Sequence, residues 1–256
     1  MTTNSKLTRA DRERKAYDEE GLWDVSHSWH ARFLHVFLSP NSTRYEKLFY
    51  GLISDNVVGK VALEVGCAEG LASKQVFDFG ARHVLGIDVS QDFISRAKPL
   101  EKPGQLEFKC ADVGAGIEGT FDVIFGRSIL HHIDYRTVLQ KLFDNNLREG
   151  GIMIFMEPLG ANPLIRIYQL VAQSAHTPDE QSFLRSDLQW FRVAFAQVRI
   201  YPFNLFSLPA GIISNFIFKE PDNLLLRLSD HVDEWFARNA SILTPYFRHC
   251  LVVIRK

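Results

Sequence analysis

The sequence is poor in cysteine. It has only three, Cys67, Cys110 and Cys250, and they lie far apart along the chain. A disulfide-stapled domain needs an even and closely spaced set, and a structural zinc site needs paired Cys or His ligands at short spacing. The cysteine content therefore excludes both frameworks and predicts reduced thiols, as in a cytoplasmic protein.

Long hydrophobic runs are also missing. The longest stretch with little charge covers about residues 205–218, whereas a helix needs about 20 apolar residues to span a bilayer. The first residues are polar and charged and do not resemble a secretory signal peptide. We therefore expect a cytoplasmic protein without stable membrane insertion.

An excess of basic charge is absent too. The chain has 29 Lys and Arg residues against 30 Asp and Glu residues, and its formal net charge is −1. Domains that bind nucleic acid usually carry a clear basic excess. The charge balance predicts no nucleic-acid partner, and the length of 256 residues suits one globular domain with insertions.

Two common nucleotide-binding motifs are missing. No G-x-x-x-x-G-K-[ST] phosphate loop occurs in the chain. The dinucleotide fingerprint G-x-G-x-x-G is met only at Gly66, because Ala68 and Leu71 occupy its other two glycine positions. These departures exclude a Walker-type nucleotide site and disfavour an NAD-dependent oxidoreductase.

A related pattern is present around residues 61–77. An apolar run over 61–65 contains Glu64, a small-residue loop follows at 66–70, and 71–77 has the character of a helix. Gly66 and Gly70 allow a tight turn and close approach of the backbone to a ligand. Strand, glycine loop and helix are the opening unit of a nucleotide-binding α/β domain.

Four further apolar segments predict strands at 84–88, 106–110, 121–126 and 152–156, with helical patterns between them. This alternation indicates a parallel sheet with helices on both faces. Ligands bind such sheets at the carboxyl ends of the strands. The polar residues that fall there are Glu64, Asp88, Asp112, Ser128 and Glu157.

The pattern E-x-G-x-[GA]-x-G at 64–70 and the five strand ends over residues 61–157 resemble class I S-adenosylmethionine (SAM) methyltransferases. The resemblance implies a Rossmann-like α/β fold, with a seven-stranded, mostly parallel sheet, an antiparallel last strand and helices on both faces. It implies SAM as cofactor and S-adenosylhomocysteine (SAH) as product. The residues expected to bind the cofactor are Tyr17, Arg32, Glu64, Gly66, Cys67, Ala68, Gly70, Asp88, Val89, Ala111, Asp112, Val113, Arg127 and Ser128.

Within that resemblance, the carboxylate of Asp88 accepts the ribose hydroxyls, and Asp112 faces the adenine amino group. Residues 1–256 form a single domain, with an N-terminal helical lid over 1–56 and a SAM-binding core over 57–158. Tyr17 or Arg32 of the lid would reach the methionine carboxylate. Residues 159–196 and 204–244 are inserts that cap the substrate, although these inserts could instead serve a dimer interface or contact a membrane surface.

The segments at 157–163 and 177–180 also resemble a bacterial subgroup that methylates small molecules. That subgroup often has His where this chain has Ala161 and Gln181, so no role of those histidines is carried over. Thr177 and Glu180 form a T-P-x-E capping box that predicts the start of a helix. This structural explanation is sufficient, and we assign no catalysis to Glu180.

Methyl transfer to a hydroxyl requires removal of a proton, for which an imidazole is well suited. His131 and His132 follow the fourth predicted strand, close to the expected methyl group, and are the first candidates for the base. His27 and His30 in the lid are rivals, and Glu157 is a rival carboxylate. A histidine pair here could equally line the pocket without taking part in catalysis.

The fourth strand ends in Gly126-Arg127-Ser128, which offers no carboxylate for magnesium, so we expect no metal. The resemblance implies a cytoplasmic SAM-dependent transferase of secondary metabolism that methylates oxygen on a small apolar or aromatic molecule. Nitrogen and carbon remain open as acceptor atoms. A fold relative that binds SAM without transferring methyl, such as a cyclase, is the alternative. The protein would be a monomer or a homodimer.

Overall fold

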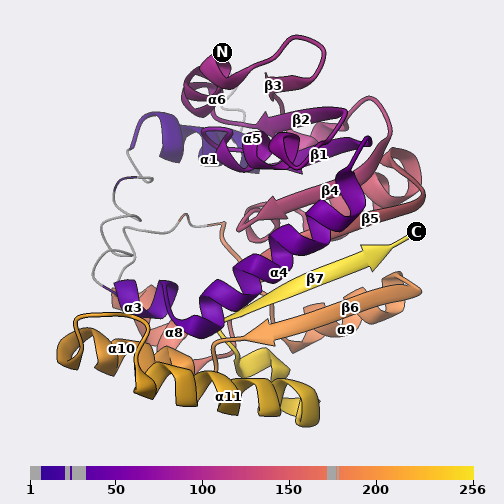
Figure 1. The fold of residues 1–256 in the computed structure, drawn as a ribbon. Coiled ribbons are helices and arrows are strands. Elements are labelled where there is room, and N and C mark those ends of the chain that lie inside the picture. The colour runs from indigo at the N-terminus through magenta and orange to yellow at the C-terminus, as the bar shows by residue number, and fades with distance from the viewer. Residues whose placement is uncertain (1–6, 21–23, 25–32, 172–176, 178) are drawn as a thin grey trace.

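The computed structural model describes residues 7–20, 24, 33–171, 177 and 179–256. Its centre is one seven-stranded sheet (Figure 1). The strands are β1 (Val61–Val65), β2 (His83–Asp88), β3 (Leu106–Cys110), β4 (Phe121–Arg127), β5 (Leu147–Pro158), β6 (Gln197–Phe203) and β7 (His249–Arg255). Their order across the sheet is β3-β2-β1-β4-β5-β7-β6.

The pairing directions confirm the expected fold. β1 pairs in parallel with β2 and β4, β2 with β3, and β4 with β5. β7 is antiparallel to both of its neighbours, β5 and β6. The carboxyl ends of β1 to β6 therefore lie along one edge of the sheet, and the beginning of β7 lies at that same edge.

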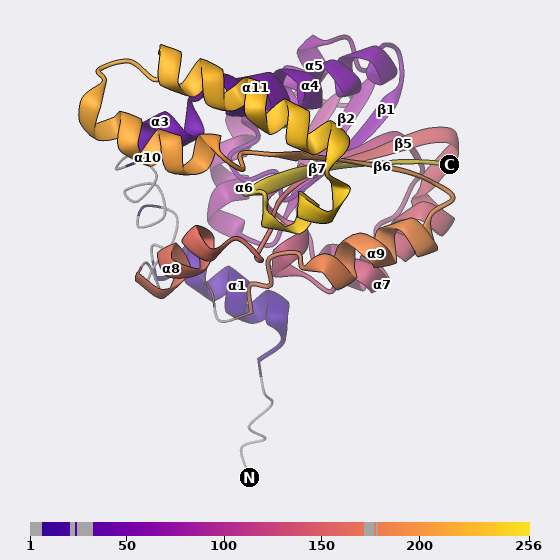
Figure 2. The same ribbon diagram turned by 90° about the horizontal axis from the view of Figure 1, so that it is seen from below.

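Helices cover both faces of the sheet. They are α1 (Arg9–Asp18), α3 (Leu34–Phe37), α4 (Pro40–Val57), α5 (Leu71–Asp78), α6 (Gln91–Ala97), α7 (Tyr135–Lys141), α8 (Pro163–Val171), α9 (Arg185–Ala194), α10 (Ser207–Ile217) and α11 (Leu224–Asn239). Figure 2 shows α4, α5 and α11 on one side of the sheet and α7 and α9 on the other. None of the described helices has both the length and the apolarity needed to cross a membrane.

Two hydrophobic clusters hold these layers together, because alternate residues of a strand point to opposite faces. On β1, Leu63 faces the cluster that contains α7 and α9, whereas Ala62 faces the cluster that contains α4 and α5. Short 3₁₀ or π turns join several of these elements, among them η2 (Val113–Ala115) and η3 (Leu130–His132).

One expected helix start is wrong. No helix begins at Thr177, and α9 starts at Arg185. The backbone N–H of Thr177 does donate to Glu180 (2.9 Å), as in a capping box, but the Thr177 hydroxyl donates to Glu13 of α1 (2.6 Å). A tertiary contact has therefore taken the side chain that would otherwise have capped the helix.

The side chain of Phe108 on β3 packs against the loop that follows β1. This side chain is 1% exposed, and its ring would lie 2.5 Å from a Cβ on Gly70 and 2.7 Å from a Cβ on Gly86.

We predict that Phe108→Ala lowers the free energy of unfolding by about 3–5 kcal/mol, because it leaves a cavity in a closely packed layer. Urea unfolding followed by circular dichroism measures this. Leu71→Ala, at a side chain 68% exposed, is the control and should change it by about 0.5 kcal/mol or less. A loss at Phe108 no larger than the control's would contradict this packing.

Candidate cofactor and active site

The loop after β1 has a backbone that favours glycine. Gly66, Ala68 and Gly70 all have positive φ, at 73°, 43° and 80°. A Cβ on Gly66 would lie 2.8 Å from the side chain of Ile129, and one on Gly70 would lie within 3 Å of Phe108. Both glycines are therefore fixed by conformation and by space. The contact with Ile129 also places the loop directly against the turn that follows β4.

Asp88, the last residue of β2, holds this loop. One carboxylate oxygen accepts the N–H of Ala68 (2.9 Å), and the other accepts the N–H of Ser90 (2.9 Å). Burial raises the pKa of Asp88, although these two N–H donors lower it. Each carboxylate oxygen has a second lone pair, so Asp88 can accept hydroxyl groups of a ligand beside the loop.

Glu64 lies behind the loop. Its side chain is buried and accepts a hydrogen bond from the Ser73 hydroxyl of α5. Burial raises the pKa of Glu64 to about 8, so the group is mostly protonated at neutral pH. Burial also raises the pKa of the Cys67 thiol. Both side chains therefore support the loop as neutral groups.

The residues expected around an adenine follow β3. Ala111 donates its N–H to the carbonyl of Asp88 (2.9 Å), and the carboxylate of Asp112 accepts the N–H of Gly114 (2.8 Å). Val113 is buried, and Ala111 and Asp112 are half-buried. The ends of β2 and β3 thus form one continuous border beside the loop.

Arg127 is the last residue of β4, Ser128 follows it, and both are exposed. The guanidinium of Arg127 pairs with Glu46 of α4 at 2.9 Å. Ser128 adopts a positive φ of 51°, and its N–H donates to the carbonyl of Met156 (2.8 Å). This bend turns the chain away from the sheet and toward His131.

Helix α1 lies across the carboxyl ends of the strands. Arg14 donates to the carbonyl of Val89 (2.9 Å), and Asp18 accepts from Ser90 at the start of α6. The Tyr17 ring packs between the rings of Phe93 and His132, with centroid distances of 5.6 and 6.2 Å. Burial raises the pKa of Tyr17. The other predicted lid residues, His27, His30 and Arg32, lie outside the described residues.

His131 forms a buried pair with Glu157. One oxygen of Glu157 accepts the N–H groups of Ile129 and Leu130, both at 2.9 Å, and the other lies 2.7 Å from Nδ1 of His131. Burial and the neighbouring His132 lower the pKa of His131, and this outweighs the opposite effect of Glu157. Among the described residues, Nε2 of His131 has no hydrogen-bond partner, so its lone pair can accept a proton.

His132 has different surroundings, although its ring lies only 4.1 Å from that of His131. Its Nδ1 lies 3.0 Å from Glu13 of α1, and its Nε2 lies 3.9 Å from Glu180. Burial lowers the pKa of His132, but the hydrogen bond to Glu13 and the charges of Glu13 and Glu180 raise it above its ordinary value. The two carboxylates therefore favour the protonated form of His132 relative to an ordinary histidine.

Sequence analysis missed two members of this cluster, Glu13 and Glu180. Glu13 is 4% exposed in the structure but sits in a charged run that suggests a solvated helix. Glu180 had a sufficient explanation as a capping residue. No local pattern in the sequence indicates that these acids meet a histidine more than 40 residues away.

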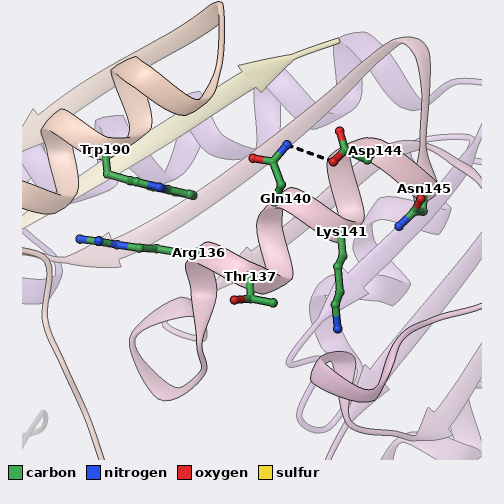
Figure 3. Close-up of a pocket in the computed structure, with 7 residues that line it drawn as sticks. All are labelled: Arg136, Thr137, Gln140, Lys141, Asp144, Asn145 and Trp190. Carbon is green, nitrogen blue, oxygen red and sulfur yellow. Dashed lines mark hydrogen bonds between the residues drawn. The ribbon is translucent and has the colours of Figure 1, made fainter.

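A hollow of about 500 Å³ lies elsewhere, between α7 and α9 (Figure 3). Arg136 of α7 and Trp190 of α9 lie next to each other there, with the guanidinium carbon 5.7 Å from the centre of the indole ring. Its lining runs along α7 to Asn145, close to the beginning of β5. The hollow therefore lies on the outer helix layer and toward the amino ends of the strands. It is separate from the cluster at their carboxyl ends.

Comparison with known proteins identifies the segment that contains the glycine loop, Asp88 and the histidine pair. Residues 63–155 match a family model described as "Methyltransferase domain". These residues run from β1 through β5 and include the glycine loop, Asp88 and the histidine pair. Residues 63–155 are therefore similar to a methyltransferase domain.

Curated relatives match part of this chain over part of their own length. A phosphoethanolamine N-methyltransferase of Triticum aestivum is 32% identical over 140 residues, covering 47% of this chain and 28% of the relative. A ubiquinone biosynthesis O-methyltransferase of Idiomarina loihiensis is 29% identical over 114 residues, covering 43% of this chain and 46% of the relative. The matches thus span less than half of these relatives.

Solved structures share the fold over most of the chain. A plantazolicin methyltransferase with bound SAH has a TM-score of 0.57 and 15% identity, covering 96% of this chain and 95% of that one. A [4+2]-cyclase has a TM-score of 0.51 and 17% identity, covering 82% and 80%. Similarity at this level establishes the fold of the chain. It does not distinguish transfer from cyclisation.

The contrast between the two histidines is testable by NMR titration. We predict that His132 titrates above 6.5, the ordinary value for histidine, and that His131 titrates below it. His132 then contributes stability that is complete below pH 6.5 and is lost as the pH rises through its folded pKa. His131 acts oppositely, because stability falls as the pH drops from 6.5 to its folded pKa.

Ring C–H resonances, assigned with single histidine variants, measure both values. Glu13→Gln should lower the pKa of His132, because it removes the charge at Nδ1, and should change that of His131 much less. The reverse order of titration in the unaltered protein would contradict the assignment of the two environments.

Proposed function

We propose that the domain is a SAM-dependent methyltransferase that moves a methyl group to a small molecule, with oxygen as the favoured acceptor atom. The observation that carries this proposal is the junction of β1 and β2. There the loop has no room for a Cβ at Gly66 or Gly70, and its Ala68 N–H donates to the carboxylate of Asp88. Hydroxyl groups of a ribose could bind Asp88 while the loop backbone approaches the rest of the ligand.

The residues present fit SAM better than a dinucleotide. The loop contains Glu69, which faces Arg96 at 3.1 Å, and a carboxylate beside the loop disfavours a pyrophosphate. SAM has no phosphate and carries a positively charged sulfonium. The acids at this edge, Asp88, Glu13 and Glu180, favour a cationic ligand by simple electrostatics.

In this proposal the cofactor would be held by the loop 66–70, by Asp88 and Val89, by 111–113 and by Tyr17 of α1. Residues 1–56 would act as the lid and 57–158 as the core. The inserts 159–196 and 204–244 would cap the acceptor. The contacts of α1 with Val89 and Ser90 support the lid assignment, because they close the ligand region over β2.

When bound, SAM supplies an electrophilic methyl group to a nucleophile held in line with it. The protein must also remove the proton of a hydroxyl acceptor, and His131 is suited to this. Its Nδ1–H donates to Glu157, which fixes the tautomer and the ring orientation and leaves the Nε2 lone pair as the base. His132 is less suited to this role, because its Nδ1 already faces Glu13 and the nearby carboxylates raise its pKa.

The names of the two relatives described above support a small-molecule acceptor but leave its identity open. They include an O-methyltransferase and an N-methyltransferase. The similarity to a [4+2]-cyclase keeps one alternative, a SAM-binding protein that catalyses a reaction other than methyl transfer. A gain of 14 Da in the product distinguishes transfer from that alternative, because a methyl group replaces a hydrogen.

Calorimetric titration of the purified protein with SAM, SAH and NAD tests the cofactor. We expect micromolar binding of SAM and SAH and none of NAD. Asp88→Ala should weaken SAM binding by about 1–3 kcal/mol, because it leaves ligand hydroxyls and the Ala68 N–H without their acceptor. Asp92→Ala, at an exposed acid in the following helix, is the matched control and should bind like the unaltered protein. NAD binding, or unchanged SAM binding in Asp88→Ala, would contradict the placement of the ribose.

The role of His131 is tested by turnover at saturating SAM, once a mass-shift screen has found an acceptor. His131→Ala should lower kcat by roughly 10²–10⁴-fold, the usual contribution of a general base. Glu157→Gln should lower it at least tenfold, because an amide N–H facing Nδ1 reverses the tautomer and protonates Nε2. His132→Ala should retain more activity than either. Full activity in both His131→Ala and Glu157→Gln would show that no base is needed or that it lies elsewhere.

A further inference from the structure

Arg248 lies at the same edge of the sheet as the candidate site. It directly precedes β7, and its carbonyl accepts the N–H of Leu159 (2.9 Å) while its own N–H donates to the carbonyl of Asn204 (2.9 Å). In the register of β5 and β7, Glu157 is opposite Cys250, and Pro158 is opposite His249. The Arg248 backbone therefore lies one strand beyond the pair formed by His131 and Glu157.

The guanidinium of Arg248 is buried and has no acidic partner. The residue is 7% exposed. The guanidinium carbon lies 4.2 Å from the centre of the Phe37 ring, and Nη1 makes one long hydrogen bond to the side chain of Asn204 (3.4 Å). No carboxylate of the described residues forms an ion pair with it. The rest of the chain cannot supply one, because residues 1–6, 21–23, 25–32, 172–176 and 178 contain neither Asp nor Glu.

This arrangement is unusual for a buried charge. Arg and Lys are rarely buried unless they are paired, and an uncompensated buried charge is strongly destabilising. Burial lowers the pKa of Arg248 to about 10, so the group is still a cation at neutral pH. In contrast, Arg44 of α4 pairs with Asp230 and Glu234 of α11. The fold thus neutralises one partly buried arginine and leaves the more deeply buried one unneutralised.

The neighbours of Arg248 indicate what kind of molecule would supply the missing charge. Phe37 of α3 presents its aromatic ring to the guanidinium. Tyr168 of α8 lies near enough that the charge of Arg248 offsets part of the rise that burial causes in the pKa of Tyr168. A planar guanidinium binds a carboxylate or a phosphate through two parallel hydrogen bonds. An organic molecule with an apolar body and one anionic group therefore matches this corner of the edge.

We propose that Arg248 binds a carboxylate or phosphate group of the methyl acceptor, so that the domain selects acidic substrates. The assignment rests on the proposed methyltransferase function. The acceptor would lie with its anionic group over β7 and its nucleophilic atom near His131, over the neighbouring strands β4 and β5. Arg248 is then a specificity-determining residue and takes no part in the chemical step.

Thermal unfolding with small probes tests this assignment. Benzoate and phenyl phosphate carry the two anionic groups, and benzamide is a neutral molecule of the same shape as benzoate. At matched ionic strength, and at concentrations ten times a probe's Kd, an anion should raise the Tm of the unaltered protein by about 2–5 °C. Benzamide should raise it less. The comparison of benzoate with phenyl phosphate identifies which anion is preferred.

Three variants make the test specific. Arg248→Met should abolish the difference between the anions and benzamide, and Arg248→Lys should keep part of it because it keeps the charge. Arg199→Met, which removes an exposed arginine of β6, is the matched control for net charge and should respond like the unaltered protein. An equal response to benzoate and benzamide, or an anion response retained in Arg248→Met, would overturn the proposal.

The Tm without added probe gives a second, independent readout. Arg248→Met should raise it, because it replaces an uncompensated buried charge by an apolar side chain of similar length. A merely structural Arg248 would instead lower the Tm on replacement. Calorimetric titration with SAH distinguishes a failure of the proposed methyltransferase function from a failure of the Arg248 assignment. If the unaltered protein does not bind SAH, the methyltransferase function is contradicted. The anion series, run also without SAH, tests Arg248 itself.

Discussion

The candidate active site depends on the hydrogen bonds made by the buried carboxylate of Glu157. It ends β5, yet its oxygens accept the N–H groups of Ile129 and Leu130 and contact His131 in the turn after β4. Ile129 in turn packs against Gly66 of the cofactor loop. Loss of this carboxylate would leave buried N–H groups without an acceptor and would free both the turn and the imidazole. The geometry of the β1 loop and of the base is thus linked through one side chain.

Much of the fold could be predicted from the sequence because its signals are local. The apolar runs at 61–65, 84–88 and 121–126 and the loop 66–70 specify strands and a turn by themselves, and the parallel order follows from alternation with helices. Asp88 was placed correctly at a strand end because its position depends only on that strand. Local signals failed at Thr177, where a contact with Glu13 from α1 replaced the expected helix cap.

The charges inside the site could not be predicted for the same reason. Glu13, Glu180 and Arg248 are polar residues in segments that give no sign of burial, and each becomes buried or half-buried only when distant segments meet. The adjacent residues His131 and His132 illustrate this limit. They have the same side chain, yet one is paired with a carboxylate of β5 and the other is held between two acids from α1 and the 177–180 segment. Their opposite pKa shifts arise from tertiary structure.

Charge is also distributed unevenly along the carboxyl edge. Asp88 on β2 lies in the half of the sheet that contains the glycine loop, whereas Arg248 lies beside β7 in the other half. A cationic cofactor is favoured at the first half and an anionic acceptor at the second. The reacting atoms of the two would then meet between these halves, beside His131 and at the end of β4. Because Asp88 is half-buried and Arg248 is buried, salt should screen these two charges less than exposed ones. The proposed preference for acidic acceptors should therefore persist at high ionic strength.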